Sequence, residues 1–203
     1  MSDESTFSER LNMMQYYPKD DPIRALARSP IFLWRLGLGP ILGKIFMVIT
    51  TRGRKSGTPH RVMTEYHVLD GVKYAPCAFG EQSDWYKNIK ADPYVTIQTS
   101  SGTEKALASR VIEDGELLEL YHLIHRRNAP ILVWYLNSMG IEDDPDEVLA
   151  NKNKVVFMRF DPVKEDRLPG LDVDLAWIYP AILLGLLALR ILYNILLPGK
   201  DRD

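Results

Sequence analysis

Apolar and polar residues alternate along several short runs between residues 46 and 160. A period of two, in segments rich in β-branched residues, is typical of half-buried strands. The pattern predicts six strands, at residues 46–51, 61–69, 72–78, 94–99, 104–112 and 154–160. Asp70-Gly71 separates the second strand from the third, and Ser101-Gly102 separates the fourth from the fifth, as tight hairpin turns do. Such short links indicate an antiparallel sheet, which we expect to close into a small barrel.

Helical spacing predicts three helices among these strands, at residues 84–90, 114–127 and 131–138. Ser83 precedes the first helix as a candidate N-cap, and residues 143–147 indicate an acidic turn. Upstream, residues 30–35 predict a short helix that ends in a Gly-Pro turn. The chain has neither regular strand–helix alternation nor a G-x-G-x-x-G motif, so the predicted class is α+β with an antiparallel split β-barrel and flanking helices.

The most apolar segment is residues 175–197, with nine Leu and four Ile. As a helix it would reach about 35 Å, against a hydrocarbon core of about 30 Å. The aromatic residues Trp177, Tyr179 and Tyr193 lie near its ends, as they do at membrane interfaces. We expect a membrane anchor or an interfacial helix, and the alternative is a helix packed on its own domain or on a partner chain.

The chain of 203 residues divides into a core domain and extra segments. These are a polar N-terminal segment at 1–28, a domain at 29–162, a linker at 163–174, the hydrophobic helix at 175–197 and a tail at 198–203. The N-terminus lacks the basic start and apolar core of a secretory signal, so we expect the domain on the cytoplasmic face of a membrane. A net charge of −2 gives no basic excess for nucleic acid, and a single cysteine excludes a disulfide framework. No metal site is expected.

Positive charge is concentrated in one loop, between the first two predicted strands. Residues 52–61 hold four Lys or Arg residues and two glycines. Glycine lets backbone N–H groups approach an anion closely, and arginine can hold a phosphate with two parallel hydrogen bonds. The loop is not a Walker motif. It is therefore either a phosphate or polycarboxylate site or a solvated basic turn.

A second segment, residues 77–88, runs from the end of a strand through a glycine turn into a helix. Backbone amides at such a helix start can bind polar rings and anions. Trp85 and Tyr86 also suit a role as core anchors for a short helix. Asn88 can either cap the helix or bind a ligand, and the sequence pattern does not separate these two roles.

The two segments together carry a family resemblance. T-T-R-G-R-K-S-G-T-P-H at 50–60, followed by A-F-G-E-Q-S-D-W-Y-K-N-I-K-A-D-P-Y-V at 78–95, resembles the deazaflavin-dependent nitroreductase family. The lead-in R-L-G-L-G-P-I-L-G at 35–43 is also similar to that family. Its members use the deazaflavin coenzyme F-420 on a split β-barrel. The resemblance implies an oxidoreductase that passes a hydride from reduced F-420 to a quinone, a nitroaromatic or an activated alkene.

The resemblance also implies a set of cofactor-binding residues: Arg52, Arg54, Lys55, Ser56, Gly57, His60, Arg61, Cys77, Ala78, Phe79, Gly80, Trp85 and Asn88. In this interpretation Arg54, Lys55 and Arg61 hold the phosphate and the anionic tail, while the backbone of 77–80 meets the ring. The candidates for the substrate side are Tyr121, Trp134 and Tyr135. Tyr135 is also the candidate proton donor, and no other catalytic residue is assigned.

Two alternatives use the same basic loop. One is a split-barrel module that binds a flavin or a lipid without turnover, and the other is an oxidoreductase that uses flavin mononucleotide (FMN). The expected partners are a small apolar acceptor, a membrane contacted through 175–197, and, by analogy with other split barrels, a second copy in a homodimer.

Overall fold

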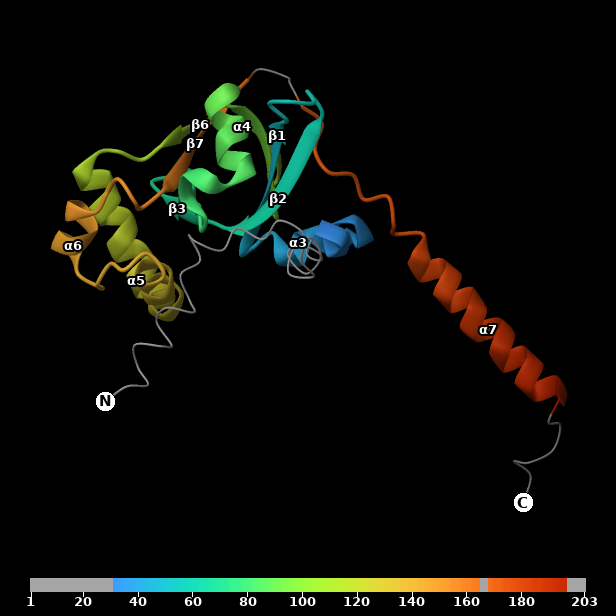
Figure 1. Ribbon diagram of the computed structural model, residues 1–203. Helices are drawn as coiled ribbons and strands as arrows, with labels where there is room; N and C mark the ends of the chain where they lie inside the picture. Colours follow the sequence, from blue (N-terminus) through green and yellow to red (C-terminus); the bar gives the residue numbers. More distant parts are fainter. Residues whose placement is uncertain (1–30, 165–167, 197–203) are drawn as a thin grey trace.

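A computed structural model describes residues 31–164 and 168–196, and the N-terminal segment and the tail predicted above lie outside these ranges (Figure 1). Its centre is one antiparallel sheet. The strands are β1 (Phe46–Arg52), β2 (Pro59–Glu65), β3 (His67–Leu69), β4 (Val72–Pro76), β5 (Tyr94–Thr99), β6 (Gly102–Arg110) and β7 (Phe157–Val163). Their order in the sheet is β2-β1-β5-β6-β7-β4-β3. The α+β class with an antiparallel sheet is therefore confirmed.

The barrel is split rather than closed, which corrects the expectation of closure. β2 and β3 are the two edge strands, and no ladder joins them. The strand predicted at 61–69 is interrupted at Tyr66, whose backbone N–H donates to Ile45 O at 3.2 Å and whose hydroxyl donates to Gly43 O at 3.0 Å. Because the chain passes directly from β2 to β3 at this residue, the edges are linked by backbone and not by strand pairing. The Asp70-Gly71 turn has the expected positive φ at both residues, 49° and 81°.

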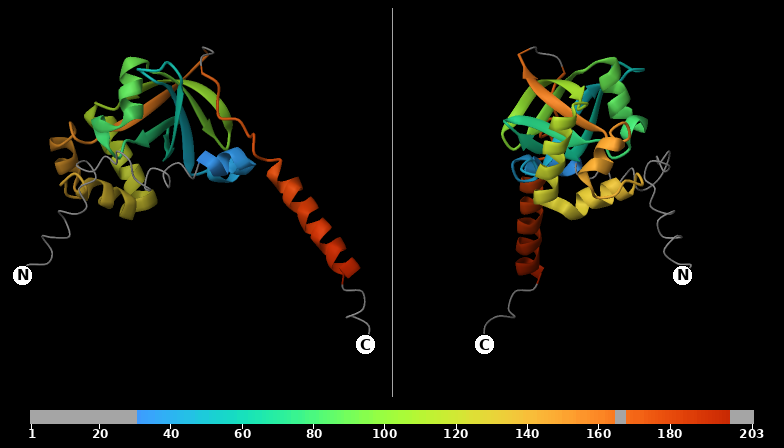
Figure 2. Two further views of the ribbon diagram at one scale, coloured as in Figure 1. Left: turned by 45° about the vertical axis from the view of Figure 1, so that its right-hand side comes forward. Right: turned by 90° about the vertical axis from the view of Figure 1, so that its left-hand side faces the viewer.

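Helices cover the ends and one side of the sheet (Figures 1 and 2). They are η1 (Trp34–Leu38), α3 (Gly39–Leu42), η2 (Gly80–Gln82), α4 (Asp84–Ala91), α5 (Asp114–Asn137), α6 (Pro145–Ala150) and α7 (Ile178–Leu196). α5 joins the two helices predicted at 114–127 and 131–138 across a kink, where Asn128 leaves helical geometry two residues before Pro130. The predicted acidic turn is wrong, because Asp144 caps α6 by accepting hydrogen bonds from the N–H groups of Asp146 and Glu147.

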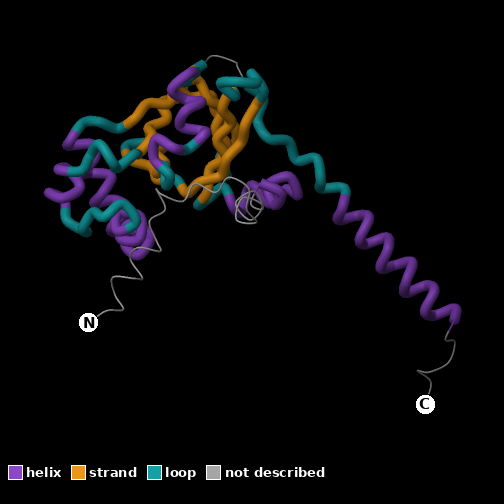
Figure 3. Tube along the Cα trace, viewed as in Figure 1, coloured by secondary structure: helices purple, strands orange, loops and turns teal. Residues whose placement is uncertain are grey.

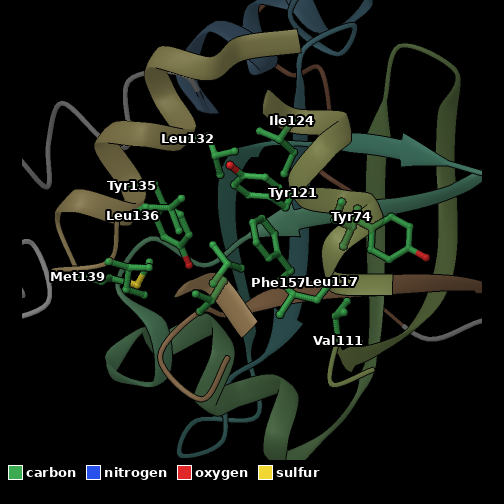
Figure 4. Close-up of a cluster of buried hydrophobic side chains, with 14 residues drawn as sticks. Tyr74, Val111, Leu117, Tyr121, Ile124, Leu132, Tyr135, Leu136, Met139 and Phe157 are labelled. Carbon is green, nitrogen blue, oxygen red and sulfur yellow. The ribbon is translucent and has the colours of Figure 1, made fainter. Parts of the chain in front are cut away.

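Two apolar clusters form the core. One fills the sheet's concave side and includes Met47, Ile49 and Ile97, with Tyr86 and Ile89 of α4 closing over it. The other packs α5 and α6 against the sheet and is drawn in Figure 4, where the labelled side chains of α5 face Phe157 of β7. α4 therefore covers the concave core and directly follows the glycine turn.

The segment expected to be a free linker lies on the opposite, outer face of the sheet. We call residues 168–174 the strap. Thr96 Oγ1 donates to Leu168 O at 2.6 Å, and Gln98 pairs with both backbone groups of Leu171, donating to its O at 3.1 Å and accepting from its N–H at 2.5 Å. Buried polar side chains of β5 thus hold the strap through its backbone.

α7 extends away from the domain beyond the strap (Figures 1, 2 and 3). Its described side chains are exposed, Leu183 at 68% and Leu189 at 64% among them, so the alternative of a helix packed on its own domain is not seen in the described part of the chain. Within that part, no helix combines the length and the apolar character needed to cross a membrane.

Candidate functional site

The basic loop is fixed onto α4 by one buried amide. Asn88, only 3% exposed, accepts hydrogen bonds at its Oδ1 from Arg54 N at 3.2 Å and Arg54 Nη1 at 3.0 Å. Its Nδ2 donates to Thr51 Oγ1 at 3.2 Å, at the end of β1. One turn earlier on α4, Asp84 Oδ1 accepts from Arg54 Nη2 at 3.0 Å. The strand end, the loop and the helix therefore form one hydrogen-bonded unit.

Inside the loop, glycine is required where polar side chains converge. A Cβ on Gly53 would lie 2.5 Å from both His60 Cδ2 and Ser56 Oγ, so no larger residue fits without a shift. Gly57 takes a φ of +69° and donates to Gly53 O at 2.7 Å. Ser56 Oγ contacts Thr58 Oγ1 at 2.7 Å and His60 Nε2 at 3.2 Å. Two hydroxyls and an imidazole thus gather at an exposed tip.

The positively charged side chains of this loop differ in whether a carboxylate neutralises their charge. Arg52 pairs with Asp92 at 3.1 Å, and Arg54 pairs with Asp84. Lys55 is exposed and makes no hydrogen bond or ion pair with the described residues. It is therefore the loop's freely available cation, next to the hydroxyl of Ser56.

Arg61 lies on the other face of the sheet, away from this cluster. In the β1–β2 ladder, Thr51 is opposite His60, Thr50 is opposite Arg61 and Ile49 is opposite Val62. Because side chains alternate, His60 shares the concave face with Ile49, while Arg61 points outward. There its Nη2 donates to Gly170 O of the strap at 3.2 Å. A joint clamp of Arg54, Lys55 and Arg61 is thus not assembled, and His60 takes the place beside the loop.

Arg61 instead borders a cavity of about 350 Å³ between the strap and the lead-in helix, lined by Ile31, Arg35, Arg61, Leu171, Asp172 and Asp174. Arg35 and Asp174 neutralise each other there by a bidentate ion pair. The cavity is on the outer face, and Arg61 is the one residue of the 52–61 segment among those that line it.

The glycine turn at 77–80 precedes α4 and contacts its N-terminal end. Cys77 N donates to Val156 O at 2.8 Å, and Gly80, with a φ of +49°, donates its N–H to Cys77 O at 2.7 Å. The Cys77 thiol is buried and donates to Gly80 O and to Ser83 Oγ, both at 3.2 Å. Burial raises the pKa of Cys77 to about 12, so the thiol is protonated at neutral pH.

This contact corrects the capping role predicted for Ser83, which makes no side-chain capping bond to α4.

The start of α4 also brings together the basic loop and the glycine turn. Ser83 contacts the turn and the next residue, Asp84, contacts Arg54, so the turn and the loop meet at the start of α4. Ala78, Phe79 and Trp85 are half-buried beside this point, and Trp85 packs against the concave core.

The aromatic residues predicted for the substrate side do not converge. Tyr121 and Tyr135 are buried in the α5 cluster (Figure 4), while Trp134 is 44% exposed on the other side of α5. The Tyr121 hydroxyl donates to Asp143 Oδ1 at 2.9 Å. The Tyr135 hydroxyl donates to Val156 O at 3.4 Å and accepts from Val156 N at 3.2 Å.

Burial raises the pKa of Tyr135 above the usual tyrosine value. A fully buried phenol whose bonds end on backbone is poorly placed to hand a proton to a substrate, which argues against the role of proton donor. Its contact with Val156 indicates a positioning role instead, because Val156 O also receives the N–H of Cys77.

Two residues of the site were not among the predicted ones. Asp84 is the carboxylate partner of Arg54, and Thr51 is the hydroxyl partner of Asn88. The signal for Asp84 was present in the sequence, because Asp84 and Asn88 are four residues apart on a predicted helix and so share one face. Nothing in the strand pattern marked Thr51.

The donor set suits a cofactor that carries phosphate and carboxylate groups. Lys55 offers a free ammonium group, and the adjacent Ser56 and Thr58 offer hydroxyls on the same exposed tip. Among the described residues no group of three or more His, Cys, Asp or Glu side chains lies together as metal ligands would. The fold and this loop define a split-barrel protein with a basic loop held on a short helix.

The sequence profile of the F420H(2)-dependent quinone reductase family matches residues 37–138, half of the chain, and the chain belongs to this family. It is therefore an oxidoreductase whose cofactor is coenzyme F-420. The matched range includes the basic loop, the glycine turn, α4 and all of α5. The sequence matches no curated protein.

Solved structures with a similar fold include an F-420-H2-dependent reductase, with 17% identity, coverage of 58% of this chain and 95% of that chain, and a TM-score of 0.45. The haem storage protein HutZ from Vibrio cholerae has 14% identity, coverage of 73% and 98%, and a TM-score of 0.42. General stress protein 26 from Bacillus anthracis has 16% identity, coverage of 63% and 88%, and a TM-score of 0.40.

Proposed function

We propose that this oxidoreductase reduces a lipid-soluble quinone, with reduced F-420 as the two-electron donor. The observation that carries the proposal is the meeting of the basic loop and the glycine turn at the start of α4. It brings the basic loop and the half-buried apolar turn to the same end of one helix. When bound, reduced F-420 supplies the hydride.

The chain's own residues would divide the work between binding and positioning. Lys55, Ser56 and Thr58 would bind the anionic groups of the cofactor. Asn88 would fix the position of the loop by its hydrogen bonds with Arg54 and Thr51. Ala78 and Phe79 would cover the reacting ring and limit access of water, since both are half-buried at the turn.

We further propose that α7 contacts a lipid bilayer, which would bring the site close to apolar acceptors. Exposed Leu and Ile residues lie on most of the circumference of the helix, and its polar side chains Arg190 and Asn194 are four residues apart and share one face. A helix with a broad apolar surface and a narrow polar one suits the interface of a bilayer, with the polar face toward the head groups. Trp177 and Tyr179 lie at its domain end and Tyr193 at its far end, as interfacial aromatics do.

Cofactor choice is tested by titrating the purified full-length chain with oxidised F-420 and, in parallel, with FMN. Tight F-420 binding with weak FMN binding is expected. Stronger FMN binding would contradict the proposal and favour the FMN-dependent alternative.

Substrate choice is tested by following oxidation of reduced F-420 with a quinone, a nitroaromatic and an activated alkene as acceptors. Faster turnover with the quinone is expected. Preference for either other acceptor would change the substrate class, and binding without any consumption of reduced cofactor would favour a non-catalytic module. Light scattering on the same preparation tests the homodimer predicted by analogy.

A further inference from the structure

A second apolar surface lies on the domain itself, at the lead-in segment before β1. We call it the lead-in patch, and its residues are Phe32, Leu33, Ile41, Ile45 and Phe46. Ile41 is 68% exposed and Ile45 is 57% exposed, although the segment packs Trp34 inward at 5% exposure. Soluble monomers rarely expose several large apolar side chains together unless the surface has a partner.

The lead-in patch is tied to the base of α7. Arg35 donates to Asp174 through Nε at 2.8 Å and through Nη2 at 2.6 Å, and Leu175 N donates to Arg35 O at 3.1 Å. Both views of Figure 2 show the lead-in helices and the start of α7 at the same end of the barrel. A bilayer that receives α7 at Trp177 therefore also meets this segment.

Charge favours an anionic surface as the partner. Residues 31–51 contain no Asp or Glu, and because Asp174 neutralises Arg35, Lys44 is the cation that this segment leaves for a partner. Lys44 is exposed between Ile41 and Ile45. A lysine among apolar side chains can place its stem in lipid and its ammonium group among anionic head groups.

We propose that the lead-in patch is a second lipid-binding surface, which docks the domain onto an anionic bilayer beside the insertion point of α7. The inference rests on the proposed membrane contact of α7. A single helix on a strap would tether the domain without orienting it, and a second contact fixes the orientation. β1 runs from Phe46 at the patch to Arg52 at the basic loop, a span of about 20 Å. The loop that binds the cofactor's anionic tail is thus kept away from anionic lipid.

The only cysteine, Cys77, is fully buried, so an introduced cysteine can carry a single polarity-sensitive fluorophore. The full-length chain is labelled at the patch with Ile41→Cys, at α7 with Leu187→Cys and at a control with Ile112→Cys. Ile112 is an exposed apolar residue that follows β6, and β6 begins beside the lead-in segment and ends at the opposite end of the barrel. Each protein is mixed with vesicles of phosphatidylcholine and phosphatidylglycerol, and with vesicles of phosphatidylcholine alone.

We expect a blue shift and a several-fold rise in emission from positions 41 and 187 on the anionic vesicles, with no change at 112. A shift at 187 without one at 41 would overturn the inference and leave the proposed role of α7 standing. No shift at either would contradict both. A shift at 41 that depends on protein concentration, without vesicles, would identify a second copy of the chain as the partner instead.

An unlabelled variant gives an independent measure. Ile41→Asp, at an exposed position, should weaken co-sedimentation with the anionic vesicles by several-fold while thermal unfolding stays as in the wild type. Ile112→Asp is the matched control, at an isoleucine that is 65% exposed, and should sediment like the wild type. Equal binding by both variants would overturn the inference.

Discussion

Asn88 Oδ1 accepts two hydrogen bonds from Arg54, one from the backbone N–H and one from the guanidinium group. A side-chain amide can accept two bonds and donate two, so Asn88 can also hold Thr51 through its Nδ2. The residue is buried, and its partners come from the strand and from the loop. This one amide therefore sets the position of the basic loop relative to α4.

Replacing Asn88 by alanine should lower both stability and cofactor affinity. The buried Oγ1 of Thr51 and the backbone N–H of Arg54 lose a partner, and leaving such groups unpaired costs about 1–3 kcal/mol. Urea unfolding measures the first effect, and titration with F-420 measures the second. Asn137→Ala, at an exposed asparagine of α5, is the matched control and should change neither quantity. Unchanged affinity in a folded Asn88→Ala protein would separate the loop from the cofactor.

Lys55→Ala should weaken F-420 binding without affecting the fold. The side chain is exposed and has no partner among the described residues, so its removal leaves no group unpaired. Attraction between an exposed ammonium group and an anionic ligand is screened by salt, so the loss of affinity should be larger at low ionic strength. Lys154→Ala removes the same charge near α6, where Lys154 contacts Asn151, and should bind as the wild type does. An equal loss in both variants would indicate a general charge effect.

Tyr135→Phe distinguishes a proton donor from a positioning residue. Loss of the hydroxyl leaves Val156 N without its partner, so the free energy of unfolding should fall by about 1–2 kcal/mol. Turnover should change by less than the loss of an essential proton donor, which is on the order of 10²-fold or more. Tyr179→Phe, at an exposed tyrosine of α7, serves as the control. A hundredfold slower hydride transfer with unchanged stability would restore the catalytic assignment.

Much of the sheet could be predicted because its inward positions alternate with outward ones along each strand. β5 occupies the predicted 94–99, and α4 begins at the predicted residue 84. The interruption at Tyr66 was not visible, because Tyr66 fits the alternation of Val62, Thr64 and Val68, while its hydrogen bonds go to the lead-in segment. α6 was missed because an Asp-Pro start with acidic neighbours suits both a turn and a capped helix.

The site was predictable as a pair of segments and less so as individual side chains. The predicted strand began at residue 61, whereas β2 begins at Pro59 and includes both His60 and Arg61. Neighbouring residues of a strand point to opposite faces, so only His60 is on the side of the loop. The strap was expected to be a linker because its own side chains carry no pattern. The strap is bound to β5 through its backbone, because Thr96 and Gln98 form hydrogen bonds with its carbonyl groups. No side-chain pattern in the strap can predict such contacts.

Gly170→Ala should release the strap. A Cβ at this position would lie 2.9 Å from Gln98 Cδ and Nε2, so Gln98 must move and its two bonds to Leu171 are lost. Limited proteolysis should then cleave faster around Leu171. Gly185→Ala on α7, where a Cβ meets no atom within 4 Å, is the matched control and should be cleaved at the wild-type rate. Equal cleavage of the two variants would mean that Gln98 does not hold the strap.

His67 should make the domain lose stability in mild acid. The side chain is buried on β3, and desolvation, aided by the charge of Arg127, lowers its pKa from 6.5 to about 4. Glu65 Oε1 is 3.9 Å from Nε2, too far to offset this by a hydrogen bond. Between these two pKa values the unfolded chain binds a proton that the folded chain does not, so the free energy of unfolding falls as the pH drops from 6.5 to 4.

The loss attributable to His67 approaches about 3 kcal/mol at the acid end of this range, since each unit of pKa corresponds to about 1.4 kcal/mol. Urea unfolding of the wild type and of His67→Gln at a series of pH values measures it as the difference between the two curves. Above pH 7 the difference should be constant, because the imidazole is neutral in both states. His122→Gln, at an exposed histidine, is the matched control and should keep the wild-type profile. Parallel curves for the wild type and His67→Gln would show that burial of His67 does not control the acid sensitivity.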